Sequence, residues 1–461
     1  MASRWQGVLG GSAVVGIGLV VELGSQFVRT VLLARLLGAS EFGLVAAITT
    51  LTAIVEMVSF IGIDRYIVYS SRGGQRQALG VGHTLCWLRG ILSALAVAAL
   101  AVPTATVIGT PEYAGSIAFV AIAPLLRGAM HLGPTQMQRS GIFWRGAAAD
   151  ASGALLGLAV AAIAAFIAPD HRAVLWAVGA QAGGAMLLTH VLAGRIPYRL
   201  SLDREFMHEA LRYGLPLVAN GLALAAAFQL DRIVVGAWLG VAALGVYGFS
   251  MTLFLQPISL LGRLGMTALQ PKLSSVWHAD RYGAFPVLVR RLDRYCAALG
   301  SAGAAATACL GAPMLRLAFG RSFSTSDVFF IFMAGIVLLR LSRAAQGLLG
   351  HATGRTRDLM TATTVSSAAV PITIGAFYIQ AGPEAAVLGV LIAELLSVIV
   401  ADVLLRRHTG GTHWVVPAPL TGAGVLLAAL GAWIVLVDPT LWERALATVV
   451  GLAGAALLLL L

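Results

Sequence analysis

The sequence of 461 residues is poor in charge. Asp, Glu, Lys and Arg make up 11% of it, whereas soluble domains carry about 25%. It contains a single lysine, Lys272, so the lysine-rich surface that would suit a nucleic acid is missing. Its three cysteines, Cys86, Cys296 and Cys309, show no paired spacing, and the nucleotide-binding pattern GxxxxGK[ST] is absent. These shortages argue against a nucleic-acid partner, a disulfide framework and a zinc or other metal site.

The sequence is rich in long apolar runs. Apolar residues make up 59% of the chain, and the mean hydropathy is +0.88. A membrane-spanning helix needs about 20 predominantly apolar residues, and the continuous apolar runs exclude the alternating pattern of a barrel. We therefore expect an all-α polytopic membrane protein with about fourteen transmembrane helices. The predicted spans are residues 10–35, 42–63, 79–108, 115–133, 147–168, 173–193, 214–238, 242–262, 295–318, 326–347, 359–379, 384–405, 418–437 and 444–461.

The basic residues predict an orientation, because cytoplasmic loops of membrane proteins are enriched in Lys and Arg. Alternate connections starting from the N-terminus collect twenty-two basic residues, and Arg340 and Arg343 are assigned to that side as loop residues. An even number of spans then places both termini in the cytoplasm, in a bacterial inner membrane. The opposite side collects five arginines, which are Arg35, Arg172, Arg316, Arg321 and Arg444.

The two halves of the chain resemble each other. The segment QFVRTVLLARLLGASEFGLV starts at Gln26, and QLDRIVVGAWLGVAALGVYG starts at Gln229. Arg29 and Gly38 of the first segment align with Arg232 and Gly240 of the second. An offset of about 200 residues corresponds to six spans, which predicts a parallel repeat. The expected organisation is a six-helix lobe at 1–198, a second six-helix lobe at 199–407, and two additional helices at 408–461.

These segments carry a family resemblance. Parts of the chain resemble the polysaccharide transporter (Wzx-like oligosaccharide flippase) family. They are "LLARLLGASEFGLVAAITTL" followed by "FIGIDRYIVYS", the later "YGLPLVANGLALAAAFQLDRIVVGAWLGVAALGVYGFS", and "ATGRTRDLM". This family is part of the multidrug/oligosaccharidyl-lipid/polysaccharide exporter superfamily. The resemblance covers about the first 400 residues. It implies a flippase that moves polyprenyl-pyrophosphate-linked oligosaccharides across the inner membrane, with two lobes around a cavity that opens alternately to each side. The last two helices depart from the many members with twelve spans and resemble the extra pair of lipid II flippases.

Four arginines lie well inside predicted spans, and the topology does not explain them. An arginine at the centre of a bilayer costs about 2.5–3.5 kcal/mol on insertion scales, so it persists where it faces a wet cavity or a partner. Arginine stays protonated and binds phosphate oxygens with a two-pronged fork. We therefore predict that these side chains, with two glutamines beside them, line a basic cavity and bind the pyrophosphate. The predicted substrate-binding residues are Arg29, Arg232, Arg89, Arg127, Gln26 and Gln229.

The predicted spans also contain carboxylates, and two interpretations of them stay open. Glu22, Glu56, Asp231 and Glu394 are candidates for coupling transport to H⁺, Na⁺ or the membrane potential, which needs a titratable group inside the membrane. The same residues could instead form salt bridges with the buried arginines. Glu22, Gln26 and Arg29 share one helical face because they are spaced four and three residues apart.

The sequence therefore predicts an alternating-access flippase for an undecaprenyl-type pyrophosphate-linked glycan in polysaccharide biosynthesis, with no catalytic residues and no cofactor. The expected partners are that lipid-linked glycan, the bilayer and a polysaccharide polymerase or export complex, with no nucleic acid. One alternative is a cation-coupled drug or metabolite exporter of the same superfamily, whose cavity would be rich in carboxylates and aromatic residues. A membrane glycosyltransferase or polysaccharide polymerase is the other, but the outer loops are too short for a typical site of that kind.

Overall fold

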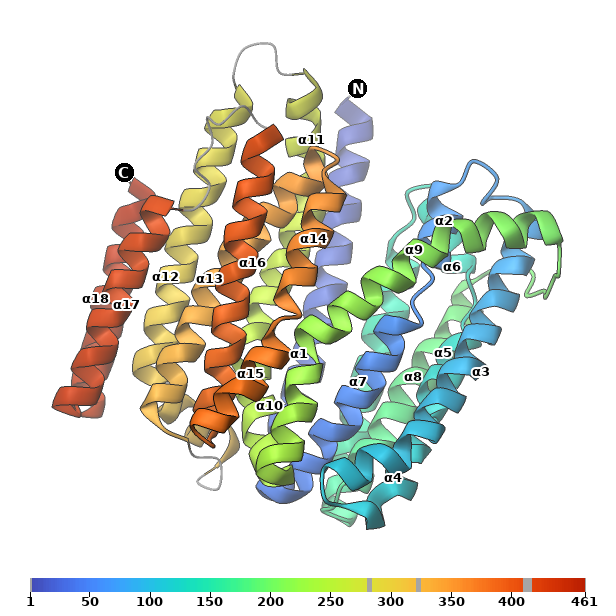
Figure 1. The fold of residues 1–461 in the computed structure, drawn as a ribbon. Coiled ribbons are helices and arrows are strands. Elements are labelled where there is room, and N and C mark those ends of the chain that lie inside the picture. Colours follow the sequence, from blue (N-terminus) through green and yellow to red (C-terminus); the bar gives the residue numbers. More distant parts are fainter. Residues whose placement is uncertain (1, 280–283, 321–324, 409–416, 461) are drawn as a thin grey trace. The chain divides into compact units, whose positions relative to one another are not determined.

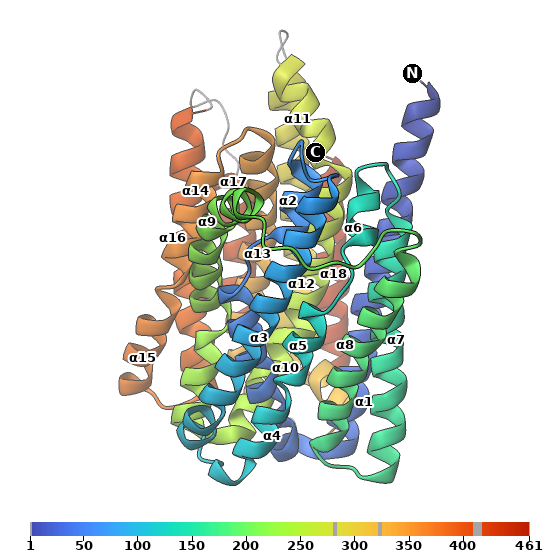
Figure 2. The ribbon, with the colours of Figure 1, turned by 90° about the vertical axis from the view of Figure 1, so that its right-hand side faces the viewer.

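The computed structural model describes residues 2–279, 284–320, 325–408 and 417–460, and these residues form helices joined by short connections (Figures 1 and 2). Arg321 and residues 409–416, at the start of the predicted C-terminal addition, lie outside the described residues. Within the described part, ten helical stretches are long and apolar enough to cross a membrane. The prediction of an all-α polytopic membrane protein is therefore confirmed.

The helices follow one another with few irregular residues between them. A short 3₁₀ turn at Pro111–Tyr113 precedes α4. The α-helices are α1 (Ala2–Val58), α2 (Ile63–Tyr69), α3 (Arg76–Val107), α4 (Ala114–Phe119), α5 (Ile122–Gly128), α6 (Gly133–Gln138), α7 (Trp144–Ile167), α8 (Arg172–Leu192), α9 (Arg204–Phe228), α10 (Leu230–Ala268), α11 (Gln270–Ala279), α12 (Ala284–Phe319), α13 (Asp327–Ala352), α14 (Thr356–Ser366), α15 (Ala369–Ile379), α16 (Pro383–His408), α17 (Pro417–Val437) and α18 (Leu441–Leu460).

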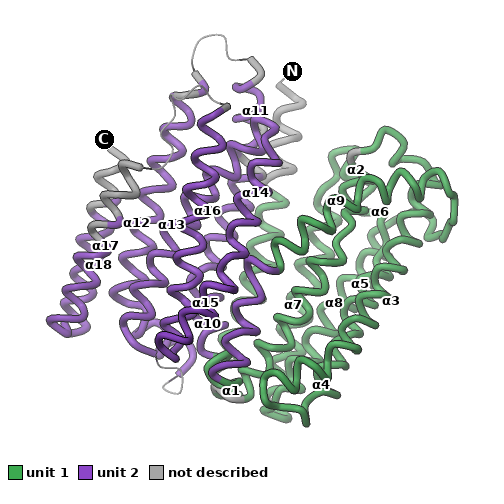
Figure 3. Tube along the Cα trace, viewed as in Figure 1, with its two compact units in different colours: residues 1–225, 240–245 green, residues 226–239, 246–461 purple. Residues whose placement is uncertain are grey.

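The chain divides into two compact units, which Figure 3 shows in green and purple. Unit 1 comprises residues 1–225 and 240–245, and unit 2 comprises residues 226–239 and 246–461. The division falls within α9 and α10, and the lobe boundaries expected from the sequence repeat stay a prediction. Helices α17 and α18 belong to unit 2, where they pack against α12 and α13.

Two glycines interrupt long helices with the same backbone conformation. Gly38 in α1 has φ 78° and ψ 175°, and Gly240 in α10 has φ 82° and ψ 174°. This region of φ and ψ is open essentially to glycine alone. The two glycines are the aligned positions of the sequence repeat, so the two halves of the chain share a sharp turn as well as a sequence pattern.

Prolines break two of the predicted spans. The predicted span at residues 115–133 is not one continuous helix, because α4 ends at Phe119 and α5 starts at Ile122. Pro124 has no N–H to donate to the carbonyl of Val120, which instead accepts from Ala123 at 3.0 Å. The break between α14 and α15 has the same cause: Pro371 cannot donate to Ser367, whose carbonyl accepts from the residue before the proline, Val370.

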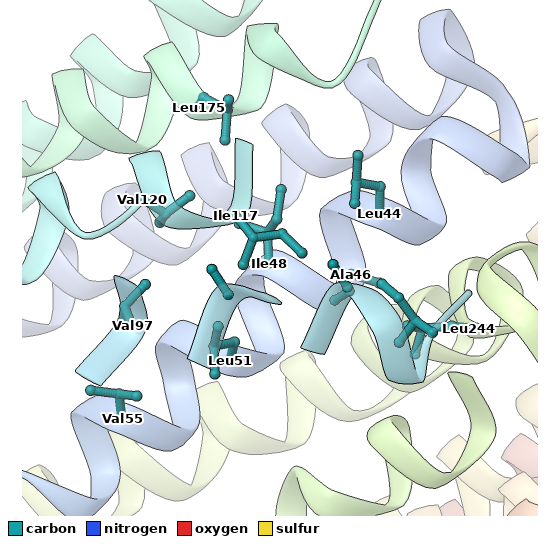
Figure 4. Close-up of a cluster of buried hydrophobic side chains, with 14 residues drawn as sticks. Leu44, Ala46, Ile48, Leu51, Val55, Val97, Ile117, Val120, Leu175 and Leu244 are labelled. Atoms are coloured by element: carbon teal, nitrogen blue, oxygen red, sulfur yellow. The ribbon is translucent and has the colours of Figure 1, made fainter. Parts of the chain in front are cut away.

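An apolar core holds the helices of unit 1 together. Figure 4 shows Ile48 and Leu51 of α1 beside Ile117 of α4, with Leu175 of α8 and Leu244 of α10 in the same cluster. These side chains are at most 7% exposed. The core therefore fixes the second half of α1, which carries Glu56, relative to α3, α4 and α8.

Three histidines hold the segment after α8 against other helices of unit 1. Tyr198 packs against the rings of His83, His131 and His190, with centroids 4.3, 5.3 and 4.9 Å away. The two nitrogens of His83 bond the carbonyl of Arg199 at 3.0 Å and the N–H of Leu132 at 3.1 Å. The nitrogens of His131 likewise bond the carbonyl of Ile196 at 3.1 Å and the N–H of Gly133 at 2.8 Å, so both rings are engaged by backbone groups.

Candidate functional site

Arg29 is the most firmly placed of the predicted arginines. It lies in α1, and its Nη1 donates to Oε1 of Gln181 on α8 at 2.6 Å. Gly157 of α7 leaves room for it, because a Cβ at that position would lie 3.0 Å from Nη1. Three helices of unit 1 therefore fix this guanidinium inside a membrane-length helix, while its remaining N–H groups are left for another partner.

The polar face of α1 continues from Arg29 toward the N-terminus. Gln26 donates from Nε2 to Oε1 of Glu22 at 3.3 Å, which confirms that the two side chains share one face. Asp150 of α7 lies close enough to Glu22 to repel it and close enough to Arg127 to attract it. Asp150 is a site residue that was not predicted from the sequence, although an acidic residue inside the predicted span 147–168 was a sufficient signal.

Glu56 forms an ion pair with Arg127, which joins the second half of α1 to α5. Nearby, Nε of Arg89 on α3 donates weakly to the hydroxyl of Ser59 at 3.4 Å. A cavity of about 20 Å³ lies among these groups, large enough for about one water molecule. Ser93 borders it with a buried hydroxyl that has no hydrogen-bond partner among the described residues.

These residues of unit 1 form one mixed-charge cluster. Arg127 is near enough to Arg29 to repel it, and Glu56 and Asp150 are near enough to Arg127 to attract it. Three arginines and three carboxylates of unit 1 therefore influence one another electrostatically. Its members are Glu22, Arg29, Glu56, Arg89, Arg127 and Asp150.

In unit 2, the residues aligned with Gln26 and Arg29 begin α10. Asp231 is 5% exposed and accepts from the hydroxyl of Tyr247 at 2.6 Å through Oδ2. Three buried polar atoms of this segment have no hydrogen-bond partner among the described residues: Oδ1 of Asp231, Oε1 of Gln229 and Nε of Arg232. Arg232 belongs to unit 2 and Arg29 to unit 1, and a cavity shared by the two stays a prediction.

The structure corrects the assignment of Arg340 and Arg343 to cytoplasmic loops. Both lie in the middle of α13 and flank the carboxylate of Glu394 on α16. Nε of Arg340 donates to Oε1 at 2.8 Å, and Nη1 of Arg343 donates to Oε2 at 2.9 Å. The error has a simple source, because the count of basic residues treats an arginine near a predicted span end as a loop residue.

Further contacts hold this trio in place. Arg343 also donates to the hydroxyls of Ser366 at 2.5 Å and Thr363 at 2.9 Å, both on α14. The ring of Phe228 lies 4.5 Å from the guanidinium carbon of Arg340. The side chain of Glu394 is 2% exposed, so the carboxylate is enclosed by its two arginines. For Glu394, the salt-bridge interpretation is the one that the geometry supports.

Comparison with known proteins identifies related sequences. A family model described as "Polysaccharide biosynthesis protein" matches residues 32–327 of the chain. The succinoglycan biosynthesis transport protein ExoT of Rhizobium meliloti (strain 1021) is 22% identical over 261 residues, which are 55% of this chain and 51% of that protein. The chain therefore spans about half the length of this curated relative.

Solved structures share the fold. The lipid II flippase MurJ in an inward closed conformation has a TM-score of 0.71 at 12% identity, covering 97% of this chain and 98% of that one. An inward-facing multidrug resistance MATE family transporter of the MOP superfamily has a TM-score of 0.64 at 14% identity, covering 86% and 95%. At these identities the likeness establishes the fold and leaves the cargo of this chain open.

Proposed function

Since this chain belongs to the polysaccharide biosynthesis protein family, we propose that it is an alternating-access flippase for a polyprenyl (undecaprenyl) pyrophosphate-linked oligosaccharide. In this proposal the lipid-linked glycan moves from the cytoplasmic to the outer leaflet of a bacterial inner membrane. Both termini lie in the cytoplasm, and a polysaccharide polymerase or export complex receives the product. The name of the curated relative, a transport protein of succinoglycan biosynthesis, supports a polysaccharide-related cargo.

The observation that carries the proposal is that Arg29 and Arg340 lie inside membrane-length helices. Each is held in place by a residue of another helix, as is Arg127 of the short helix α5. An arginine buried in a membrane marks a functional pathway by default, because its insertion is costly. A guanidinium stays charged and matches the geometry of phosphate oxygens, so the pyrophosphate of a lipid-linked glycan is a fitting ligand.

The energy source is a separate part of the proposal. Glu56 and Glu394 are paired with arginines, and Asp231 is bonded to Tyr247. Glu22 has only the amide of Gln26 as a described hydrogen-bond partner, and it lies near a second carboxylate, that of Asp150. We therefore assign coupling to H⁺ or Na⁺ to Glu22 together with Asp150, where repulsion between two carboxylates favours uptake of a cation.

The alternative of a cation-coupled drug or metabolite exporter requires carboxylates free to receive an organic cation. The charged clusters instead contain at least as many arginines as carboxylates, and most of the carboxylates already have partners. A glycosyltransferase or polymerase has less support, because the predicted outer loops are too short for a typical site of that kind.

The test replaces Arg29 and Arg232 singly with alanine and follows translocation of the lipid-linked glycan in cells or reconstituted vesicles. A charge-assisted hydrogen bond contributes about 1.5–3 kcal/mol, so we expect translocation to fall roughly tenfold or more at equal protein level. The matched control is Arg76→Ala, which removes an exposed arginine at the start of α3. Wild-type translocation by both test variants at normal membrane levels would overturn the pyrophosphate assignment.

A further inference from the structure

A cluster in unit 2 has one more positive charge than negative charges. Arg340 and Arg343 share the single carboxylate of Glu394. The ring of Phe228 lies 4.5 Å from the guanidinium carbon of Arg340, and Phe228 directly precedes the segment that carries Gln229, Asp231 and Arg232. This part of unit 2 therefore carries three guanidinium groups and two carboxylates inside membrane-length helices. An unbalanced charge in such a place is costly and calls for a counter-ion.

Arg340 is the residue best placed to hold that counter-ion. Its Nε is occupied by Glu394, and Phe228 lies against its face. Neither Nη1 nor Nη2 has a hydrogen bond to any described residue, and the side chain is 21% exposed, whereas Arg343 already bonds three groups. Glu394 therefore orients the Arg340 guanidinium through Nε, while Nη1 and Nη2 are left to bind a ligand. This is the arrangement that binds two oxygens of a phosphate in parallel.

Buried polar atoms in the segment that follows Phe228 also lack hydrogen-bond partners among the described residues. They include two acceptors, Oε1 of Gln229 and Oδ1 of Asp231, and one donor, Nε of Arg232. Buried polar atoms without partners are rare in proteins and point to a ligand, ion or water that completes them. Donors suit phosphate oxygens, whereas acceptors suit hydroxyl groups. The combination fits a sugar attached to a phosphate better than it fits a simple inorganic ion.

We propose that unit 2 contains a headgroup site in which Arg340 binds the phosphate and Gln229 and Asp231 accept hydrogen bonds from hydroxyls of the first sugar. This inference rests on the proposed function, because it takes the cargo to be a pyrophosphate-linked glycan. Glu394 and Phe228 are positioning residues that orient Arg340. The site explains why an arginine pair shares one carboxylate in the middle of α13, which ion coupling at Glu394 does not.

The experiment measures binding of inorganic pyrophosphate and of a sugar pyrophosphate to the purified full-length protein in nanodiscs. The variants are Arg340→Gln, Arg340→Lys and Asp231→Asn. The control is Arg357→Gln, which alters an exposed arginine in the first turn of α14. We expect Arg340→Gln to weaken both probes tenfold or more and Arg340→Lys to weaken them several-fold. Asp231→Asn should weaken the sugar pyrophosphate more than inorganic pyrophosphate, because it alters a sugar contact.

Each outcome has a separate meaning. Failure of the wild-type protein to bind either probe contradicts the proposed function itself. Binding by wild type that Arg340→Gln leaves unchanged overturns the headgroup site and spares the proposed function. Equal weakening of both probes by Asp231→Asn overturns the sugar contact alone. Arg340→Lys keeps the charge that Glu394 needs, so it tests the site if Arg340→Gln fails to fold.

Discussion

The ion cluster at Glu394 gives a prediction about stability whose size follows from the structure. Glu394 accepts charge-assisted hydrogen bonds from Arg340 at 2.8 Å and from Arg343 at 2.9 Å, and its side chain is 2% exposed. Removing one partner of a buried ion pair costs about 3–5 kcal/mol, because a buried charge is left uncompensated. We therefore expect Glu394→Ala to lower the free energy of unfolding by about 3–5 kcal/mol.

Glu394→Gln should cost less than the alanine variant. Its amide oxygen can still accept from one arginine, whereas its NH₂ group cannot accept from the other. One charge-assisted hydrogen bond is then lost, which corresponds to about 1.5–3 kcal/mol. Glu394→Gln should lower the free energy of unfolding less in the Arg343→Gln background than in the wild type, because the positive charge of Arg343 is then no longer present and needs no counter-ion. We expect an interaction energy of about 0.5–3 kcal/mol in this double-mutant cycle.

The assay is equilibrium unfolding in mixed micelles, followed by tryptophan fluorescence and by the fraction of monodisperse protein after heating. The matched control is Glu205→Gln, whose ion pair with Arg72 lies at the surface, where solvent screens it. We expect the control to match the wild type. A change below about 0.5 kcal/mol for Glu394→Ala, the usual range of a surface substitution, would refute the reasoning.

Two further predictions concern the backbone. Gly38→Ala and Gly240→Ala should each lower the free energy of unfolding by about 1–3 kcal/mol, because both glycines adopt a conformation that side chains disfavour. The control in the same unfolding assay is Gly375→Ala, at an open position of α15, which should be neutral or stabilising. His83→Ala should cost about 1–3 kcal/mol, because it leaves a buried backbone group unpaired. Limited proteolysis of residues 193–203 should then speed up relative to His208→Ala, and equal rates would contradict the structural role of His83.

The charges inside the helices alter how this sequence should be interpreted. Arg340 and Arg343 entered the count of positively charged loops, yet both lie in mid-helix with a carboxylate between them. Without these two arginines, the basic residues still lie mostly on one predicted side of the membrane. In unit 2 the sequence alone had indicated only Arg232 as an arginine inside a span, and the structure adds Arg340 and Arg343 within α13.

The sequence by itself determined the class of the molecule. Low charge and long apolar runs predicted an all-helical membrane protein, and the span motifs predicted the family; both predictions are confirmed. The repeat around Gly38 and Gly240 could also be recognised, because the sharp turn requires glycine at both aligned positions. These features are local: they depend on composition, on period and on single residues with restricted backbone angles.

Only the tertiary structure decided which charges meet. Arg29 bonds Gln181, 152 residues away, and Arg127 pairs with Glu56, 71 residues away. Arg340 and Glu394 are separated by 54 residues and lie on different helices. Helical periodicity shows which side chains share a face, but the partner of that face depends on how whole helices pack. The choice between ion coupling and salt bridging at a buried carboxylate therefore needed the fold.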